Sequence, residues 1–363
     1  MANLLVTGGA GFIGANFVHY WNAHHADDAV VVLDALTYAG NRDNLRGATA
    51  ELIEGDIRDT GLVEGLLRDR AIDTLVHFAA ESHVDRSIHG PDAFIDTNIL
   101  GTHSLLKAAR TVWLGDAPRP HRFHHVSTDE VYGSLGPTDP AFSESSVYAP
   151  NSPYSASKAA SDHLVRAYHH TYGLQVTTSN CSNNYGPYQF PEKLIPLFLI
   201  NALHGRDLPI YGDGMQIRDW LHVEDHCRGI AAVLARGRVG ETYCIGGGAE
   251  LPNIAVIDTL CAAVDAAFAA DPTLAVRFPD APAARGLATT SLKTTVADRP
   301  GHDRRYAIDE RRARDELGYT PARDFTAGFA ATLQWYLDNE TWWRRVLDGS
   351  YRDWVATNYA ART

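Results

Sequence analysis

Cysteine is scarce in this chain of 363 residues, and its scarcity excludes two kinds of architecture. Only four cysteines occur, and none belongs to a C-x-x-C pair: Cys181, Cys227, Cys244 and Cys261. Disulfide-rich scaffolds and cysteine-based zinc modules need more thiols at closer spacing. The adjacent pairs among the 17 histidines also lack the spacing of zinc ligands. We therefore expect free, buried thiols and no metal site.

Basic residues and long apolar runs are also in short supply. Lys and Arg number 32 against 44 Asp and Glu, which gives a formal net charge of −12. Nucleic acids and anionic membranes attract cationic proteins, so neither is an expected partner. No uninterrupted apolar run reaches the roughly 18 residues of a membrane span, and residues 1–3 lead into an apolar strand without a basic leader. The composition predicts a cytoplasmic protein that binds a small molecule.

Short β-rich runs alternate with longer helical stretches through the first half of the chain. We expect strands over residues 4–7, 30–34, 51–54, 74–78, 122–127 and 176–180. The run Val30-Val31-Val32-Leu33 is typical of a strand that helices cover on both faces. This alternation predicts an α/β fold with a doubly wound parallel sheet of the Rossmann type and a smaller mixed α/β region at the C-terminal end. We assign residues 1–184, with a later strand near 241–246, mainly to dinucleotide binding and residues 185–363 mainly to substrate binding.

A G-x-x-G-x-x-G run over residues 8–14 follows the first predicted strand. Glycine permits a tight turn and a close approach of the backbone to a pyrophosphate, which the N-terminus of the next helix attracts. Glycine-rich turns also serve plain packing, but here a strand precedes the run and a helix follows it. Asp34, at the end of the second strand, can accept hydrogen bonds from a ribose and would repel a 2′-phosphate, which favours NAD over NADP. The NAD contacts predicted from these segments are Gly8, Gly11, Phe12, Ile13, Gly14, Asp34, Asp56 and Ile57.

Tyr154 and Lys158 form a Y-x-x-x-K pattern on a predicted helix. Ser152 can cap that helix with Pro153 in its first turn, and side chains at this spacing share one helical face. A phenol with a pKa of about 10 is a poor base, but a neighbouring ammonium favours the phenolate. The alternative is a tyrosine at the edge of the core and a solvated lysine. Because a dinucleotide loop precedes the pair, we interpret it as a general base and its activating cation.

Ser127-Thr128-Asp129-Glu130 stands at the carboxyl end of the fifth predicted strand. Ligands of open α/β sheets bind outside such strand ends. Two carboxyl groups beside a hydroxyl can share the two proton transfers of an elimination. One is protonated and acts as the acid, and the other is ionised and acts as the base. A plain polar turn is the alternative. Together with the tyrosine helix, the segment indicates more chemistry than a simple dehydrogenation needs.

From end to end, the chain resembles the dTDP-glucose 4,6-dehydratases of the extended short-chain dehydrogenase/reductase superfamily. The shared segments are HFAAESHVDRS at 77–87, STDE at 127–130, CSNNYGP at 181–187, PEKLIP at 191–196, GDG at 212–214, RDW at 218–220 and DRPGHD at 298–303. The glycine run marks only the superfamily. The triplet Thr128-Asp129-Glu130 is more specific, because related 4-epimerases lack the acid–base pair. Related decarboxylases and mannose-type dehydratases typically have Ser where Asp129 stands.

The resemblance implies a closed redox cycle on NAD. Tyr154, supported by Lys158, would take the proton of the sugar C4 hydroxyl while hydride passes to NAD, and Thr128 would hold that oxygen. Glu130 would then remove the C5 proton, and Asp129 would protonate the departing C6 hydroxyl. The hydride would return to C6, so NAD is regenerated and stays bound. The implied product is dTDP-4-keto-6-deoxyglucose.

The resemblance also implies the remaining binding residues. It adds these NAD contacts: Ala80, Ser82, Thr97, Tyr154, Lys158 and Asn184. The implied substrate contacts are Ser82, His83, Thr128, Asn183, Glu192, Lys193, Leu194, Arg218, Asn253, Arg299, His302 and Tyr351. Arg218 and Arg299 suit phosphate oxygens, because guanidinium groups pair well with them, although either could be a surface ion pair. The residues before Asn253 and the segment 278–291 depart from the family pattern. We expect residues 271–285 to form a surface connection and residues 278–291 to form a surface loop.

Two alternative functions and the state of assembly stay open at this point. The substrate could be another nucleotide sugar, such as a UDP-linked one. A non-catalytic dinucleotide sensor would be expected to lose part of the Tyr154, Lys158, Asp129 and Glu130 set. Family members usually pair through two helices each, so we expect a homodimer through residues 102–112 and 156–172, with packing inside one subunit as the alternative. The apolar positions assigned to that interface are Leu105, Leu106, Ala109, Leu164, Val165 and Tyr168.

Overall fold

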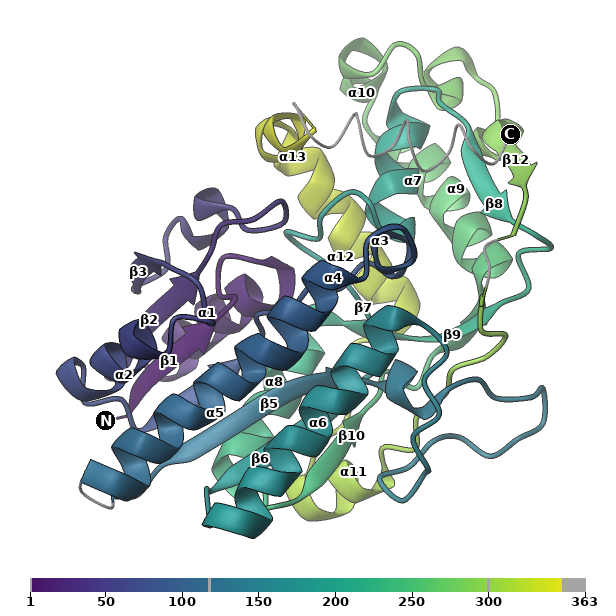
Figure 1. Cartoon of the computed structure of the whole chain (residues 1–363). Helices are drawn as coiled ribbons and strands as arrows, with labels where there is room; N and C mark the ends of the chain where they lie inside the picture. Colours follow the sequence, from purple (N-terminus) through teal and green to yellow (C-terminus); the bar gives the residue numbers. More distant parts are fainter. Residues whose placement is uncertain (1, 117–118, 299–300, 348–363) are drawn as a thin grey trace.

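The computed structural model describes residues 2–116, 119–298 and 301–347 and places seven strands in one parallel sheet (Figure 1). Across the sheet the strands are β10 (Thr242–Ile245), β6 (Val176–Cys181), β5 (Arg122–Thr128), β4 (Thr74–His77), β1 (Asn3–Thr7), β2 (Ala29–Asp34) and β3 (Glu51–Glu54). The chain winds outward from β1 in both directions, which is the doubly wound arrangement. The predicted fold class is confirmed, and the six expected strands agree with the observed ones to within one residue at each end.

Helices cover both faces of this sheet. One face carries α1 (Phe12–His24) and α8 (Val223–Arg236), and the other carries α2 (Thr60–Asp69), α5 (Thr102–Arg110) and α6 (Pro153–Tyr172). Successive side chains of a strand point to opposite faces. Accordingly Leu4 and Val6 of β1 pack in the core on the α1 side, and Leu5 between them packs in the core on the α5 side. A strand that is apolar on both faces is therefore fully buried.

The apolar positions that we assigned to a dimer interface lie mostly in this interior. Leu105, Leu106, Ala109 and Val165 are fully buried in the core between the sheet and the helices α2, α5 and α6, and Tyr168 is 9% exposed. That assignment was wrong for these residues, because the apolar stripe of each helix faces the sheet. Leu164 is partly buried and packs at the edge of the same core.

Short elements connect the sheet strands near their carboxyl ends. They are α3 (Val84–His89), α4 (Asp92–Phe94), the π-helical η2 (Ile95–Gly101), and the 3-10 turns η1 (Arg42–Leu45) and η4 (Asp129–Tyr132). A second π-helical segment, η3 (Thr111–Asp116), lies at the opposite edge, where the Trp113 indole N–H donates to the carbonyl oxygen of Ile72 just before β4. A further helix, α11 (Arg311–Leu317), packs near β10 through Ala313 and Leu317. These connections place polar residues around the carboxyl edge of the sheet.

The C-terminal region has its own core and two small sheets (Figure 1). The sheets consist of β11 (Glu250–Pro252), β9 (Ile217–His222) and β7 (Asn183–Tyr185), and of β12 (Lys293–Val296) paired with β8 (Leu208–Tyr211). The helices are α7 (Leu194–Leu203), α9 (Asn253–Ala270), α10 (Thr273–Arg277), α12 (Phe325–Asp338) and α13 (Glu340–Val346), with 3-10 turns η5 (Pro282–Arg285) and η6 (Thr289–Leu292). The strand β10 returns from this half of the sequence and pairs with β6 in the large sheet.

The segment 271–291, expected at the surface, is mostly exposed, but a few of its side chains anchor it to this core. Leu274 and Phe278 are 2% exposed and Ala281 is fully buried. Thr289 is buried as well, and both its backbone N–H and its hydroxyl donate to Asp265. The surface prediction is confirmed for most of the segment and wrong for these anchoring side chains, because Pro and polar residues interrupt the segment and hide their spacing.

One helix of the described residues, α9, is apolar and long enough to cross a membrane, with 18 residues and a mean hydropathy of 1.5. One side of it, including Val256, Leu260 and Val264, is fully buried in the C-terminal core. Its acidic residues have partners outside the helix, since Asp258 pairs with Lys293. The helix thus packs one side against the C-terminal core.

The four cysteines are free and buried, as expected from their scattered positions. Burial raises the pKa of Cys181 and of Cys227 far above the ordinary thiol value. Such thiols stay protonated and unreactive at neutral pH. Within the described residues no group of three or more His, Cys, Asp or Glu side chains is placed to hold a metal ion.

Candidate active site

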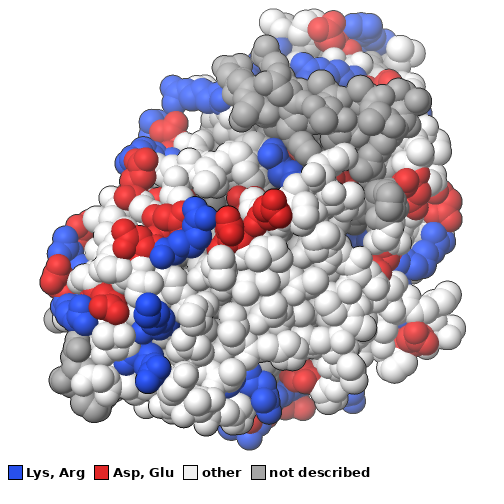
Figure 2. All heavy atoms as spheres, viewed as in Figure 1, with Lys and Arg blue, Asp and Glu red and all other residues white. Residues whose placement is uncertain are grey.

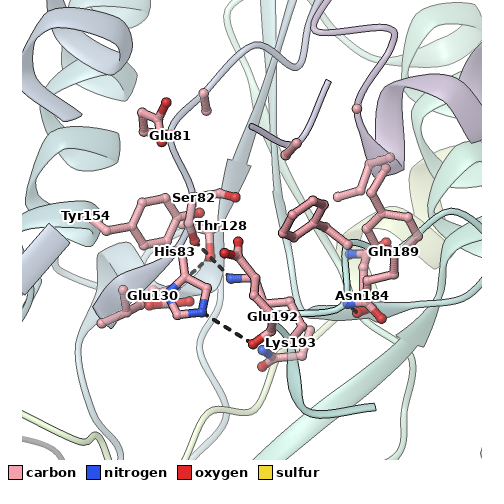
Figure 3. Close-up of a pocket in the computed structure, with 18 of the residues that line it drawn as sticks. Glu81, Ser82, His83, Thr128, Glu130, Tyr154, Asn184, Gln189, Glu192 and Lys193 are labelled. Atoms are coloured by element: carbon pink, nitrogen blue, oxygen red, sulfur yellow. Dashed lines mark hydrogen bonds between the residues drawn. The ribbon is translucent and has the colours of Figure 1, made fainter. Parts of the chain in front are cut away.

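A cavity of about 490 Å³ lies between the carboxyl ends of the parallel strands and the C-terminal region. Figure 3 shows Thr128, Glu130, Tyr154 and His83 on one side of it. Every described residue of the predicted site lines this cavity: Gly8, Gly11, Phe12, Ile13, Gly14, Asp34, Asp56, Ile57, Ala80, Ser82, His83, Thr97, Thr128, Asp129, Glu130, Tyr154, Lys158, Asn183, Asn184, Glu192, Lys193, Leu194, Arg218, Asn253 and His302. Arg299 and Tyr351 lie outside the described residues.

The glycine run forms a turn that no larger residue could make. Gly8 has a φ of +70°, and a Cβ there would lie 2.6 Å from the backbone of Ala79. A Cβ on Gly14 would lie 2.3 Å from the carbonyl oxygen of Gly8. The N-cap residue of α1 is Gly11, which has no side chain to cap the first N–H groups of the helix. The positive end of α1 therefore meets the cavity, and it fits the pyrophosphate of a dinucleotide.

Asp34 braces the same turn from the end of β2. It is 7% exposed and accepts from the backbone N–H of Ala10 at 2.9 Å and of Leu36 at 2.8 Å. Burial raises the pKa of Asp34, and the two amides oppose that shift. Asp56 lies on the rim and pairs with Arg58, at 2.7 Å between Oδ2 and Nη2. Asp34 thus stabilises the glycine turn, in addition to any contact with a ribose. Together, the glycine turn, the N-terminus of α1 and Asp34 fit NAD.

The tyrosine helix starts with the cap that its sequence predicts. The Ser152 side chain accepts from the N–H of Ser155, and the Ser155 side chain accepts from the N–H of Ser152. Tyr154 and Lys158 are 8% and 4% exposed, so the reading of Lys158 as a solvated surface residue is wrong. The Lys158 ammonium donates to the carbonyl oxygen of Val126 on β5 at 2.8 Å.

Burial opposes charge on both members of this pair. The pKa of Tyr154 is raised well above its ordinary value by burial and by Glu130, and a hydrogen bond with Thr128 lowers it. Burial also lowers the pKa of Lys158, which nearby Asp162 raises again. A phenolate at position 154 therefore needs additional positive charge nearby. Lys158 and a cationic cofactor ring are the groups that fit this need.

Thr128, Asp129 and Glu130 lie where β5 ends and η4 begins. The Thr128 hydroxyl caps the turn by accepting from the N–H of Glu130 at 3.2 Å and also donates to Asp129 Oδ1 at 3.3 Å. Asp129 is 2% exposed, and burial, Glu130 and Asp219 raise its pKa well above the ordinary value. Among the described residues, Asp129 Oδ2 has no hydrogen-bond partner.

The two neighbouring carboxyl groups therefore differ in environment. Asp129 is buried, and burial raises its pKa in the direction that favours the protonated form, whereas Glu130 is only partly buried. A protonated carboxyl is a proton donor, and a more solvated carboxylate is a proton acceptor. The arrangement can serve an elimination in which one group gives a proton and the other takes one.

Arg218 reaches the cavity from β9. It is 5% exposed, and its guanidinium donates to the carbonyl oxygens of Ile217 at 2.7 Å and Asp303 at 3.0 Å. The guanidinium also lies 4.3 Å over the ring of Tyr306. A surface ion pair, the alternative for Arg218, is therefore wrong. A buried guanidinium at the cavity suits an anionic group such as a phosphate.

The loop before α7 closes the opposite wall of the cavity. Glu192 accepts from Arg86 and from Tyr38, and Lys193 donates to the carbonyl oxygen of Ser82 at 3.0 Å. The ring of His83 approaches the carbonyl oxygen of Glu192 at 3.4 Å (Figure 3). The predicted residues of the segments 77–87 and 191–196 thus touch each other directly.

Several cavity residues were missed by the sequence analysis. Three aromatic examples are Phe190, Tyr211 and Tyr306. Tyr211 stands directly before the Gly212-Asp213-Gly214 motif, and this position was a usable signal. Tyr306 lies three residues after the 298–303 motif and donates to Asp303 Oδ2 at 2.5 Å. No periodic pattern distinguishes Phe190 and Tyr306 from core residues, so only the tertiary structure identifies these two.

Known proteins resemble the chain along almost its full length. A sequence model of the family described as GDP-mannose 4,6 dehydratase matches residues 5–332. The chain is 56% identical over 359 residues to a dTDP-glucose 4,6-dehydratase of Xanthomonas campestris pv. campestris (strain B100), covering 97% of this chain and 98% of that protein. It is 48% identical over 374 residues to dTDP-glucose 4,6-dehydratase 1 of Escherichia coli (strain K12), covering 99% of each.

Solved structures give the same result. DesIV, the dTDP-glucose 4,6-dehydratase of Streptomyces venezuelae, was solved with NAD bound and superposes with a TM-score of 0.83 at 49% identity, covering 95% of this chain and 99% of that chain. A UDP-glucose 4-epimerase of Thermotoga maritima superposes with a TM-score of 0.79 at 25% identity, covering 93% and 99%. The fold is therefore shared with epimerases, but the sequence identity is far higher to the dehydratases. The chain belongs to the dTDP-glucose 4,6-dehydratase family of extended short-chain dehydrogenases/reductases.

Proposed function

We propose that the chain converts dTDP-glucose to dTDP-4-keto-6-deoxyglucose, with one NAD that stays bound through turnover. One observation carries the proposal. Tyr154, buried Asp129 and partly exposed Glu130 line the same cavity as the glycine turn. An oxidoreductase that only moves a hydride has no use for the two carboxyl groups, whereas an elimination needs both.

The first step is assigned to Tyr154, Lys158 and Thr128. Tyr154 accepts the proton of the C4 hydroxyl, and Thr128 holds the same oxygen through a hydrogen bond. Lys158, fixed to the carbonyl oxygen of Val126, supplies a positive charge that favours the phenolate. NAD supplies the hydride chemistry, in which hydride leaves C4 first and returns at C6 last.

The second step is assigned to the carboxyl pair. A ketone at C4 acidifies the C5–H, and Glu130 removes that proton. Asp129, kept protonated by burial, gives a proton to the C6 hydroxyl, which departs as water. When hydride returns to C6, Glu130 would give its proton back to C5, and the C4 oxygen stays a ketone. Tyr154 then holds the proton taken from the C4 hydroxyl and Asp129 lacks the proton given to water, so a net proton transfer from Tyr154 to Asp129 resets the site.

The remaining cavity residues are assigned to binding. Arg218 pairs with the diphosphate, which its burial and its exposure to the cavity support. Asn183, Glu192 and Lys193 are assigned to the sugar, and Arg299 and Tyr351 are assigned by resemblance alone. Residues 1–184 together with β10 are assigned mainly to NAD binding and residues 185–363 mainly to the nucleotide sugar.

A product assay tests the proposal and its runner-up together. Purified protein is incubated with dTDP-glucose or with UDP-glucose, and the 4-keto product is followed by its alkaline absorbance. We expect product from dTDP-glucose without added reductant. Product from UDP-glucose alone would favour the alternative substrate. No product from either, although NAD and dTDP-glucose both bind, would favour a dinucleotide sensor.

We also propose that the protein is cytoplasmic and that it forms a homodimer. The two subunits would pair through η2, α5 and α6. Figure 2 shows the face of these helices as a broad area with few charged side chains. It includes Leu100, 52% exposed, and Ile95, 43% exposed. Four buried free thiols support a reducing compartment. Light scattering at micromolar concentration should give twice the mass of one chain. Leu100→Arg should lower the measured mass toward that of a single chain. A monomer mass for the unsubstituted protein would contradict the dimer.

A further inference from the structure

Asp162 is a buried carboxylate that the steps above do not use. It lies on α6 one turn after Lys158 and is 5% exposed. Its Oδ1 accepts from His125 Nε2 at 3.0 Å, and its Oδ2 accepts from the hydroxyls of Ser127 and Tyr148, each at 2.9 Å. Asn180 Nδ2 approaches the same Oδ2 at 3.4 Å. Four side chains from β5, β6 and the loop before α6 thus converge on one carboxylate.

These donors leave the negative charge of Asp162 in place. Burial lowers the pKa of His125 to about 4, so its imidazole is neutral at neutral pH and donates through an Nε2–H. The hydrogen bonds and the positive charge of Lys158 hold the pKa of Asp162 below its ordinary value in spite of burial. In the described part of the chain no cationic group hydrogen-bonds to Asp162 at neutral pH. A buried anion of this kind needs a cation close by.

Lys158 is the cation that this region offers. The ionisable groups that face it come from its own helix and from three strands: Tyr154, Asp162, His77, His125 and Cys181. Burial lowers the pKa of His77 and raises the pKa values of Tyr154 and Cys181, so these three are neutral at neutral pH. Asp162 is therefore the anion of the set, and Lys158 is the cation.

We propose that Asp162 is a positioning residue whose fixed negative charge keeps the buried Lys158 ammonium protonated beside Tyr154. The inference rests on the proposed function, in which Tyr154 needs that positive charge. Lys158 and Asp162 share one face of α6, since they are four residues apart. Their attraction acts through space, because the ammonium itself donates to Val126 on β5.

The same carboxylate links the tyrosine helix to the acid–base pair. Asn180, which contacts Asp162, also donates from Nδ2 to the carbonyl oxygen of Thr128 at 3.0 Å. Ser127, the residue before Thr128, donates its hydroxyl to Asp162. Asp162 thus holds the end of β5 against α6, and the base at 154 keeps its place relative to Asp129 and Glu130.

A double-mutant cycle on unfolding tests the charge pairing without using activity. The NAD-loaded protein carries Asp162→Asn, Lys158→Met or both, and the unfolding midpoint of each is measured. Breaking a buried pair from one side costs far more than removing both charges. We expect Asp162→Asn alone to lower the midpoint by on the order of 5 °C or to prevent folding, and Lys158→Met to restore part of the loss. Fully additive losses, or a double variant that folds no better than Asp162→Asn, would overturn the proposal.

The pH profile of turnover supplies the second test. Without the negative charge Lys158 loses its proton at lower pH. The pH at which the turnover rate falls on the alkaline side of the profile (the alkaline limb) should therefore be lower in Asp162→Asn by about one pH unit or more. Asp162→Glu should restore the limb toward its original position. Tyr148→Phe is the matched control, because it removes one donor to Asp162 but keeps the charge, and its limb should stay in place.

A uniform loss of rate at every pH in Asp162→Asn would show a merely structural role and overturn the proposal. The unfolding cycle separates this outcome from failure of the proposed function. If Lys158→Met kept full activity, the assigned role of Lys158 in oxidation would be wrong, whereas the unfolding cycle would still report whether the two charges interact.

Discussion

Arg86 and Glu192 lie 106 residues apart in the sequence and form a salt bridge, with 3.0 Å between Nε and Oε2. Tyr38 completes the group, since its hydroxyl donates to Glu192 Oε1 at 3.1 Å and its ring lies 3.8 Å under the Arg86 guanidinium. The side chain of Glu192 is only 2% exposed. These three residues, which we call the clasp, join the segments after β2 and β4 to the loop before α7. The clasp therefore ties the two walls of the cavity together.

Loss of the clasp should weaken substrate binding more than chemistry. Arg86→Met removes one of the two cations that stabilise the buried Glu192 carboxylate, the other being Lys193, and the cost of the weaker pairing displaces the loop. We expect the KM for dTDP-glucose to rise about tenfold, equivalent to about 1.4 kcal/mol, with a smaller change in kcat. Arg46→Met, which removes the exposed pair with Asp43, is the control and should change KM less than about twofold. Equal KM values in the two variants would contradict a positioning role.

Purified protein should carry NAD without any being added. The glycine turn, Asp34 and a cycle that regenerates the cofactor all favour retention. Denaturing the protein and assaying the supernatant measures the content, and we expect close to one NAD per chain. Asp34→Asn should lower it. This variant is preferable to Asp34→Ala, which would leave the N–H groups of Ala10 and Leu36 unsatisfied and destabilise the turn by about 1–3 kcal/mol. Only trace nucleotide, with activity that consumes added NAD, would contradict retention.

Damage to each catalytic pair should stall the cycle at a different point. Tyr154→Phe removes the first base, so bound NAD should stay oxidised when dTDP-glucose is added. Asp129→Asn with Glu130→Gln keeps the shape and removes acid and base, and each lost proton transfer costs about 10²–10⁴-fold. NADH absorbance should then appear after mixing and persist, with little 6-deoxy product. Normal turnover of the double variant, or neither NADH nor product while substrate still binds, would show that the assigned division is wrong.

His226 should make the protein sensitive to acid. It is fully buried beside Asn184, and burial lowers its pKa from 6.5 to about 3. Between these values the unfolded chain binds a proton that the folded chain does not, so stability present above pH 6.5 is lost as pH falls, by about 1.4 kcal/mol per pH unit. His226→Gln should lose less of its unfolding midpoint between pH 7 and 5 than the unsubstituted protein.

The acid test needs a comparison of variants, because buried carboxyls such as Asp129 and Asp219 have raised pKa values and act in the opposite direction. These groups are present in every variant and cancel. His24→Gln, on the exposed end of α1, is the control and should keep the original pH dependence. A parallel response of both histidine variants would exclude His226 as the cause.

Local chemistry made much of the fold and site predictable. The apolar run of residues 30–33 requires a strand covered on both faces, and it became β2. The glycine run follows a strand and precedes a helix, so the turn and its close backbone contacts are consequences of local geometry. Ser152 with Pro153 starts α6 wherever that helix packs. The spacing of Tyr154 and Lys158 then places both on one face, because the period of an α-helix is fixed.

Other features depend on contacts that no local pattern contains. The spacing of Leu105, Leu106 and Ala109 predicts an apolar stripe, but whether that stripe meets the sheet or a second chain is decided by packing, and it meets the sheet. Phe278 was expected at the surface and is in the core. The pKa of Asp129 is raised first by burial, which only the fold creates, then by the neighbouring Glu130 and by Asp219, which is 90 residues away. The sequence by itself determined which chemical groups stand on which element, whereas only the tertiary structure decided their charge and their partners, because burial and long-range contacts set both.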